Sequence, residues 1–229
     1  MDIYRRLIRS YRQTDVYTRW ALIVLALAIC LRFFITFFVH AAGDSYTHLV
    51  TARYIAQTGT LPLFEPIYRP FFYYPPLFHL SAAGLYPVFS SLGEAVATKA
   101  MDFVAPLYGS AMLIVFWLFA RKIVSSRIAL WSLMFLAFVP LHLYYSTVAH
   151  VDIAAAFMAL LALWLVQIKR KHLGAVVNGL GMITKYTPLC LSRSPCRVVA
   201  GHKKPQRVHQ EDGHLFWDLL FYWYIKYRT

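Results

Sequence analysis

The chain has 229 residues, of which 59% are apolar and only 14% charged, and its formal net charge is +13. A typical soluble domain carries about 25% charged residues, so this chain has too few polar side chains to cover a water-soluble particle. The composition argues against a soluble enzyme, a disordered tail and, with three cysteines, a disulfide scaffold. The basic residues flank apolar runs and form no stripe with interleaved aromatics, so nucleic acid is not expected as a partner.

Apolar runs that are long enough to cross a bilayer recur along the chain. A bilayer core of about 30 Å is spanned by about 20 apolar residues in a helix. We therefore predict an all-α fold, a polytopic transmembrane helix bundle that follows a basic cytoplasmic N-terminus at 1–19. The predicted membrane region covers 20–192, with spans at about 20–39, 103–120, 128–149, 151–168 and 172–192, and an external loop at 40–102 that carries interfacial helices.

The uncharged segment 77–93 has two interpretations. It contains His79, Pro87 and several Ser and Gly residues, so we predict an interfacial or re-entrant helix, with a further full span as the alternative. Under the first interpretation, and with a cytoplasmic N-terminus, every basic cluster beside a span lies on the cytoplasmic side, as expected in a multi-pass membrane protein. These clusters contain Arg5, Arg6, Arg9, Arg12, Arg19, Arg121, Lys122, Arg127, Lys169, Arg170 and Lys171.

The external loop begins with a predicted helix from Asp44, as its N-cap, to about residue 57, and Gly59 would end it. An apolar stripe suggests that this helix lies flat on the membrane surface. Asp44 and His48 are four residues apart and could share one helical face. The prolines and aromatics of 60–76 suit either an interfacial aromatic belt or a sugar-stacking surface.

Three segments, in this order, resemble parts of one enzyme family. Asp44, Tyr46 and His48 are followed by Ala-Arg-Tyr-Ile-Ala-Gln-Thr-Gly-Thr-Leu-Pro and Tyr-Pro-Pro-Leu-Phe-His-Leu, which resemble the first external loop of polytopic GT-C glycosyltransferases. The sequence His-Val-Asp-Ile-Ala-Ala-Ala-Phe at 150–157 is similar to that family's second external Asp motif. The sequence Gly-Leu-Gly-Met-Ile-Thr-Lys at 179–185 is similar to its Gly-Leu-x-x-Leu-Thr-Lys segment.

The resemblance is nearest to dolichyl-phosphate-mannose–protein mannosyltransferases and lipid A aminoarabinose transferases. It implies a hexosyltransferase of the cell membrane that moves a sugar from a polyprenyl- or dolichyl-phosphate donor to a protein or lipid-linked glycan acceptor at the extracytoplasmic face. It also implies that Asp44 is the first-loop catalytic carboxylate and Asp152 the second acid of the site. The lipid phosphate that leaves needs cationic stabilisation. Candidate residues for binding the substrate or the donor phosphate are Arg32, Tyr46, His48, Arg53, Glu65, Arg69 and Lys185.

Simpler roles stay open for several of these residues. Arg32 and Lys185 could snorkel to the nearest interface, and Asp44 could be only a helix cap. His48 and His79 could bind a divalent metal with Asp44 or could form ordinary hydrogen bonds. Metal dependence varies within the family that the chain resembles, so a divalent metal is left open as a cofactor.

The alternative function is that of a non-catalytic polytopic membrane protein, such as a transporter fragment or an assembly subunit. Charged groups in a transporter usually face a midplane pathway between structural repeats. In the predicted topology the acids lie at the outer boundary, and no repeat is visible in the sequence. Both features favour the enzyme over the transporter.

The resemblance breaks after Leu189, where an apolar segment gives way to a basic and irregular tail at 193–229. We expect that the chain is truncated or frameshifted after about residue 190 and that this tail comes from a non-native reading frame. A short divergent member with an interfacial tail is the alternative. A truncated chain could be an inactive fragment of the enzyme.

The reading-frame hypothesis is tested by translating the other two frames of the gene downstream of codon 190. We expect one of them to encode further apolar spans, because the family that the chain resembles continues with several. Two frames without such spans would contradict the hypothesis.

Overall fold

The structure is a computed structural model, and it describes residues 15–64, 66–67 and 75–185. In these residues the chain forms helices and no strand. The helices are α2 (Val16–Phe38), α3 (Asp44–Thr58), α4 (Leu77–Ala83), α5 (Tyr86–Phe89), η1 (Ser90–Leu92), α6 (Glu94–Asp102), α7 (Val104–Ile123), α8 (Ser126–Phe138), α9 (Pro140–Tyr145), α10 (Val151–Gln167) and α11 (Lys171–Met182).

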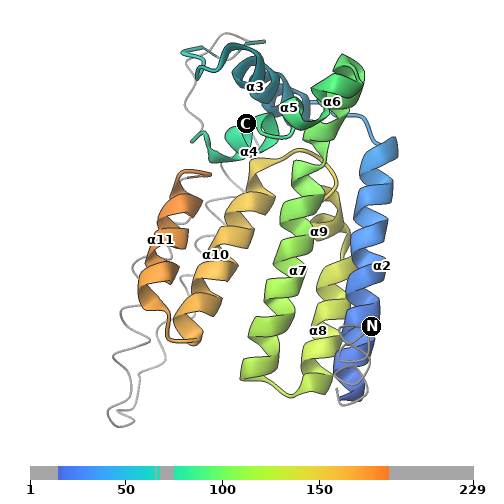
Figure 1. Cartoon of the computed structure of the whole chain (residues 1–229). Helices are drawn as coiled ribbons and strands as arrows, with labels where there is room; N and C mark the ends of the chain where they lie inside the picture. Colours follow the sequence, from blue (N-terminus) through green and yellow to red (C-terminus); the bar gives the residue numbers. More distant parts are fainter. Residues whose placement is uncertain (1–14, 65, 68–74, 186–229) are drawn as a thin grey trace, which may run out of the picture. The chain divides into compact units, whose positions relative to one another are not determined.

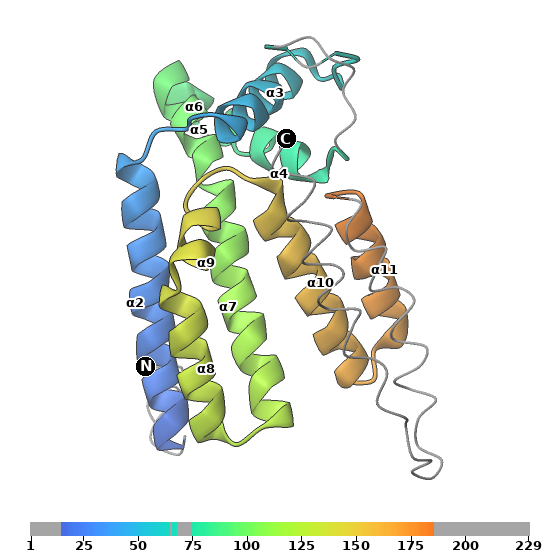
Figure 2. The same ribbon diagram turned by 180° about the vertical axis from the view of Figure 1, so that it is seen from behind.

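The long helices lie side by side, and the shorter helices α3, α4, α5 and α6 gather at one end of them, whereas α9 lies among the long helices (Figure 1). Helix α2 packs against α7 and α8, and α10 packs against α7 and α11. Helices α3 and α4 pack against each other at the end where α10 begins and α11 ends, as the view from behind also shows (Figure 2). Residues far apart in the sequence therefore meet at that end, which we call the α3 end.

Two helical segments are long and apolar enough to cross a membrane, α2 and the continuous stretch Glu94–Ile123. Helices α8 and α10 are also apolar but shorter. Together with the all-helical secondary structure, this agrees with the predicted all-α membrane helix bundle, so the predicted fold class is confirmed.

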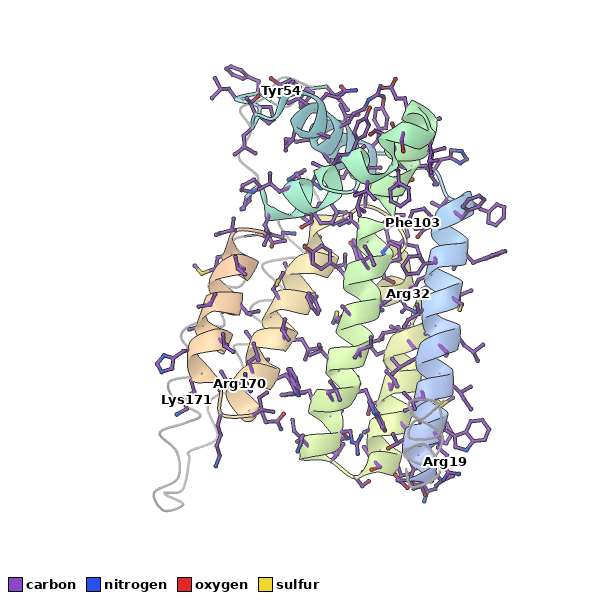
Figure 3. The ribbon with its side chains drawn as sticks, viewed as in Figure 1. Arg19, Arg32, Tyr54, Phe103, Arg170 and Lys171 are labelled. Atoms are coloured by element: carbon purple, nitrogen blue, oxygen red, sulfur yellow. The ribbon has the colours of Figure 1, made fainter. Side chains whose placement is uncertain are left out.

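The basic residues at the span ends lie away from the α3 end. Arg19, Arg170 and Lys171 lie at one end of the long helices, whereas Tyr54 and Phe103 lie at the other (Figure 3). The predicted basic residues at 5, 6, 9 and 12 lie outside the described residues, as does the predicted tail at 193–229.

Helix α3 begins differently from the prediction. Gly43 is its N-cap, with a φ of 56° that glycine adopts at little cost, and Asp44 is the first helical residue. No side chain caps the helix, so the predicted capping role of Asp44 is wrong. Gly59 ends the helix in a left-handed conformation, as predicted. The predicted apolar stripe consists of Leu49, Ala52, Ile55 and Ala56. The first three are buried in a cluster with residues of α4 and α10, and Ala56 is partly buried against it.

The segment predicted as one span at 128–149 consists of two helices, α8 and α9, that are interrupted at Val139. Pro140 causes the interruption, because it has no N–H with which to continue the α8 hydrogen bonds. The broken helix leaves carbonyl groups without their usual intrahelical donors.

Arg32 of α2 supplies one of the missing donors. Its guanidinium donates to the Ala137 carbonyl at 2.8 Å and to the Ala28 carbonyl of its own helix at 2.9 Å. It also lies 2.9 Å from Nδ1 of His142 in α9. Arg32 is completely buried, so it does not snorkel to an interface as the sequence allowed. It joins α2 to the interrupted helix.

Helices α7 and α9 approach closely at Gly109. A Cβ atom added to Gly109 would lie 2.2 Å from Cβ of the buried Ser146, which follows α9. Gly179 in α11 offers a matched control, since an added Cβ there would meet nothing within 4 Å.

We expect Gly109→Ala to destabilise the protein by about 1–3 kcal/mol, because overpacking forces the two segments apart. Gly179→Ala should be neutral or stabilising by about 0.5–1 kcal/mol, because alanine lowers the entropy of the unfolded chain. The free energy of unfolding in detergent measures both effects. Equal stability of the two variants would contradict the close approach of α7 and α9.

Candidate functional site

Polar side chains from four parts of the chain meet at the α3 end. They come from α3, from α4, from the start of α10 and from the residues just after α11. A backbone hydrogen bond of 2.9 Å from the Leu77 N–H to the Ile183 carbonyl joins the start of α4 to the end of α11. The start of α4 and the end of α11 are thereby held together.

Asp152, in the first turn of α10, has two basic partners. Lys185 forms an ion pair with one carboxylate oxygen, and Nδ1 of His150 lies 2.8 Å from the other. Nδ1 also lies 3.4 Å from the Asp152 N–H, but a single nitrogen cannot donate and accept at once. We favour the shorter, charge-assisted contact, in which His150 donates to the carboxylate. The carboxylate therefore has a fixed orientation.

His48 of α3 and His79 of α4 form a second pair. Nδ1 of His48 and Nε2 of His79 are 3.0 Å apart, and both side chains are buried. The sequence analysis left open a metal site or ordinary hydrogen bonding for these two residues, and in the structure they are joined by a hydrogen bond.

The two groups are in contact through their histidines. The rings of His48 and His150 meet edge to face, with 5.7 Å between their centroids. Tyr145, at the end of α9, also packs against the His150 ring, with 5.0 Å between the two ring centroids. A continuous series of polar groups therefore runs from His79 to Lys185.

The pKa of His48 is lowered to about 4, mainly by burial and next by the charge of His150. Asp44 and Asp152 both act in the opposite direction, and Lys185 acts in the same direction as His150. Both predicted catalytic carboxylates are thus close enough to influence one buried imidazole. Asp44 itself is exposed at the start of α3.

Other predicted site residues lie elsewhere or are not described. Arg53 pairs with Glu94 of α6, and both side chains are exposed. Tyr46 is 53% exposed, and Arg32 lies in the interior contact described above. Glu65 and Arg69 lie outside the described residues. Their predicted substrate-binding roles remain predictions.

The described residues do not fit a metal site. Asp44 and His48 were the expected ligands, but no group of three or more His, Cys, Asp or Glu residues is arranged to hold a metal ion in the part of the chain that is described. Since His48 already pairs with His79 through one ring nitrogen, we derive no step through a metal.

The predicted substrate-binding residues did not include His79 and His150, which lie within the cluster. The sequence analysis did name His79 with His48, as possible metal ligands or hydrogen-bonding residues, but the sequence gives no signal that the two rings are in direct contact. Only the packing of α4 against α3 brings His79 within hydrogen-bonding distance of His48, 31 residues away.

The comparison with known protein families bears on the identity of this cluster. The family model described as dolichyl-phosphate-mannose-protein mannosyltransferase matches residues 74–195, more than half of the chain. The chain belongs to this family. The match includes His79, His150, Asp152 and Lys185, whereas Asp44 and His48 precede it. No curated protein and no solved structure gives a significant match.

Membership in the mannosyltransferase family confirms the coarse level of the resemblance. It identifies a membrane glycosyltransferase of the GT-C kind and implies a lipid-linked sugar donor and a membrane setting. The particular donor, the acceptor and the side of the membrane are separate questions.

The ion pair between Asp152 and Lys185 gives a testable energy. Both side chains are about a third exposed, so we expect a coupling of about 1 kcal/mol between Asp152→Asn and Lys185→Met in a double-mutant cycle of unfolding in detergent. Arg53 and Glu94 are 42% and 57% exposed, and their cycle should give a smaller coupling because water screens the charges. A larger coupling for the exposed pair would contradict the geometry of the Asp152 cluster.

Proposed function

We propose that this chain, as a member of the mannosyltransferase family, transfers a sugar from a polyprenyl- or dolichyl-phosphate donor to a protein or lipid-linked glycan acceptor. The observation that carries the proposal is the convergence of Asp44, Asp152 and Lys185 on His48 at one end of the helices. Glycosyl transfer from a lipid phosphate needs a carboxylate and a cation at one place, and this end of the bundle offers both.

Lys185 is the cation for the leaving group. Its ammonium lies beside Asp152, with about a third of the side chain exposed, so a phosphate oxygen can reach it from solvent. As the bond from the anomeric carbon to the phosphate oxygen breaks, the electron pair stays on the lipid phosphate, and the ammonium stabilises the developing charge. Asp152 and His150 orient the lysine.

Asp44 is the general base for the acceptor. The carboxylate accepts the proton of the acceptor hydroxyl while the hydroxyl oxygen forms the new bond to the anomeric carbon. Its position at the first turn of α3 leaves it exposed to an incoming acceptor. Gly43, the N-cap immediately before it, has a positive φ and marks the point at which the helix begins.

The proposed active face is extracytoplasmic. Arg19, Arg170 and Lys171 lie at the opposite end of the long helices from the external segment, and lysine and arginine beside spans favour the cytoplasmic side. On this basis the N-terminus is cytoplasmic, 20–192 is a multi-pass membrane region, and 40–102 is its external loop.

We also propose that 193–229 is a tail from another reading frame. The match to the family ends at residue 195, close to the point at which the sequence turns basic and irregular. If the native enzyme continues beyond this point, the present chain is its N-terminal portion, and its activity is to be measured beside that of the longer product.

The proposed roles predict that Asp44→Asn and Asp152→Asn each lower sugar transfer by about 10²–10⁴-fold, because an amide cannot accept the proton or hold the lysine. Transfer is measured with membranes and radiolabelled polyprenyl-phosphate sugars, for this chain and for any longer product of the gene. Asp15→Asn is the control, since Asp15 precedes α2 and its side chain forms no cap hydrogen bond.

The control variant should keep its activity, and all three variants should keep their level in the membrane. Unchanged transfer in both Asp44→Asn and Asp152→Asn would remove the site assignment. Loss of transfer in Asp15→Asn would show that the assay reports stability instead of chemistry.

A further inference from the structure

The turn between α10 and α11 has an unusual residue at its centre. Helix α10 ends in two backbone hydrogen bonds, from the Arg170 N–H to the Leu165 carbonyl at 2.8 Å and from the Lys169 N–H to the Val166 carbonyl at 3.0 Å. This pattern needs a left-handed residue just after the helix, a position that glycine normally occupies. Here the residue is Lys169, with a φ of 65°, and among the described residues it is the only one other than glycine with a positive φ.

The lysine is kept at this position at a cost to stability. The Cβ atom of an L residue crowds the backbone in the left-handed region, which glycine avoids. The C-terminus of α10 does favour a nearby cation, but Arg170 and Lys171 would supply one if position 169 were glycine. Lys171 itself lies in the first turn of α11, where the helix dipole is positive and no acid is present. Residues that destabilise their own fold in this way point to a role outside it.

The turn between α7 and α8 is also basic. Arg121 and Lys122 lie in the last turn of α7, and Arg127 lies in the first turn of α8. Because α10 packs along α7, the two turns lie near each other at the end of the bundle away from α3 (Figures 1 and 2). We call the exposed basic side chains of both turns the basic face, which consists of Arg121, Lys122, Arg127, Lys169, Arg170 and Lys171.

The acids of the described part of the chain leave the basic face without a counter-charge. None of its side chains forms an ion pair with a described carboxylate. Apart from Asp15, which precedes α2, the described acids belong to the α3 end, and they are Asp44, Glu94, Asp102 and Asp152. The basic face therefore presents its positive charge to whatever lies next to it.

The apolar neighbours of the basic face indicate what that partner is. Exposed apolar side chains lie directly beside the basic ones in both turns, at Ile123, Ile128 and Leu173. A soluble acidic protein or a nucleic acid has no matching arrangement of apolar and anionic layers. In a bilayer the headgroup phosphates lie immediately outside the apolar chains, just as the basic side chains here lie immediately outside apolar ones.

We propose that the basic face binds the headgroups of anionic phospholipids, such as phosphatidylglycerol, with Lys169 at the centre of the contact. The attraction of basic side chains to an anionic leaflet provides the affinity. The proposal needs the membrane setting of the chain and does not depend on sugar transfer. The hairpin of α10 and α11 carries Asp152 and Lys185 at its other end, so a bound headgroup anchors the hairpin of the candidate site to one leaflet.

The first test measures the thermal unfolding midpoint of the full chain in a neutral detergent, with phosphatidylglycerol or phosphatidylcholine added at equal mole fractions. A ligand that binds only the folded chain raises the midpoint. We expect phosphatidylglycerol to raise it by about 2–4 °C more than phosphatidylcholine does. This difference should disappear at about 1 M salt, where charges are screened within about 3 Å. Equal shifts with the two lipids at low salt would overturn the proposal.

The second test uses Lys169→Gly, for which two opposite effects are expected. Without added lipid the midpoint should rise by about 1–4 °C, because relief of the left-handed lysine outweighs the added freedom of glycine in the unfolded chain. The concentration of phosphatidylglycerol that gives half of its shift should rise about fivefold, because one basic contact with the headgroups is lost. Lys169→Arg keeps the charge and should keep the wild-type lipid response.

A midpoint that does not rise in Lys169→Gly would show that the lysine serves the fold itself. A wild-type response of this variant to phosphatidylglycerol would show that Lys169 does not contact the lipid. Either result overturns the proposal, and neither requires transfer activity, so a chain that fails to transfer sugar contradicts the proposed function alone.

A charge-matched control separates the basic face from the net charge of the chain. Arg53→Gln removes one exposed positive charge at the α3 end and should keep the wild-type response to phosphatidylglycerol. A loss of response equal to that of Lys169→Gly would assign the effect to net charge and contradict the proposal. Inorganic phosphate and heparin, added in place of lipid, should leave the midpoint unchanged. A shift as large as that with phosphatidylglycerol would identify a site for soluble anions and would also overturn the assignment to lipid.

Discussion

The ion pair between Asp152 and Lys185 is the interaction on which the candidate site depends. It joins the start of α10 to the residue that follows the last turn of α11, across 33 positions of sequence. Two helices that are packed along their length can still slide or splay at their ends, and a charge pair there fixes the ends relative to each other. Because His150 occupies the second carboxylate oxygen, the orientation of Asp152 is fixed in addition to its position. The rest of the cluster, through the His48–His150 contact, is arranged around this carboxylate.

Two basic side chains at the same end of the bundle, Lys185 and His48, differ in how far they are buried. Lys185 is partly exposed beside Asp152, where a phosphate oxygen could reach its ammonium. His48 is buried, and its pKa is low enough to keep it neutral. This end of the bundle therefore holds a partly exposed cation and a buried imidazole within one cluster.

Much of this arrangement could be predicted from the sequence because membrane helices have a strong signal. The apolar runs gave the helices, and the glycine at 59 gave the end of α3. Asp152 and Lys185 were both named as site residues, but their direct pairing could not be predicted, since it depends on the close packing of α10 on α11. Gly174 permits that packing, because a Cβ atom there would lie 3.0 Å from the Ala162 carbonyl. Arg53 illustrates the opposite case. Its charge suited a phosphate, but only the fold shows that Glu94 lies beside it.

The contact of Arg32 with the interrupted helix has a consequence for the order of assembly. The guanidinium belongs to α2, whereas its most distant partner carbonyl, that of Ala137, is made 105 residues later. Until α8 and α9 have been synthesised, the arginine lacks two of its final partners, and a bare guanidinium inside hydrocarbon is costly. Helix α2 must therefore keep this side chain hydrated, or held by the insertion machinery, until α8 and α9 have been made. Lateral release of α2 into lipid would then wait for the arrival of the kinked helix, so a single buried side chain would time the closure of the bundle.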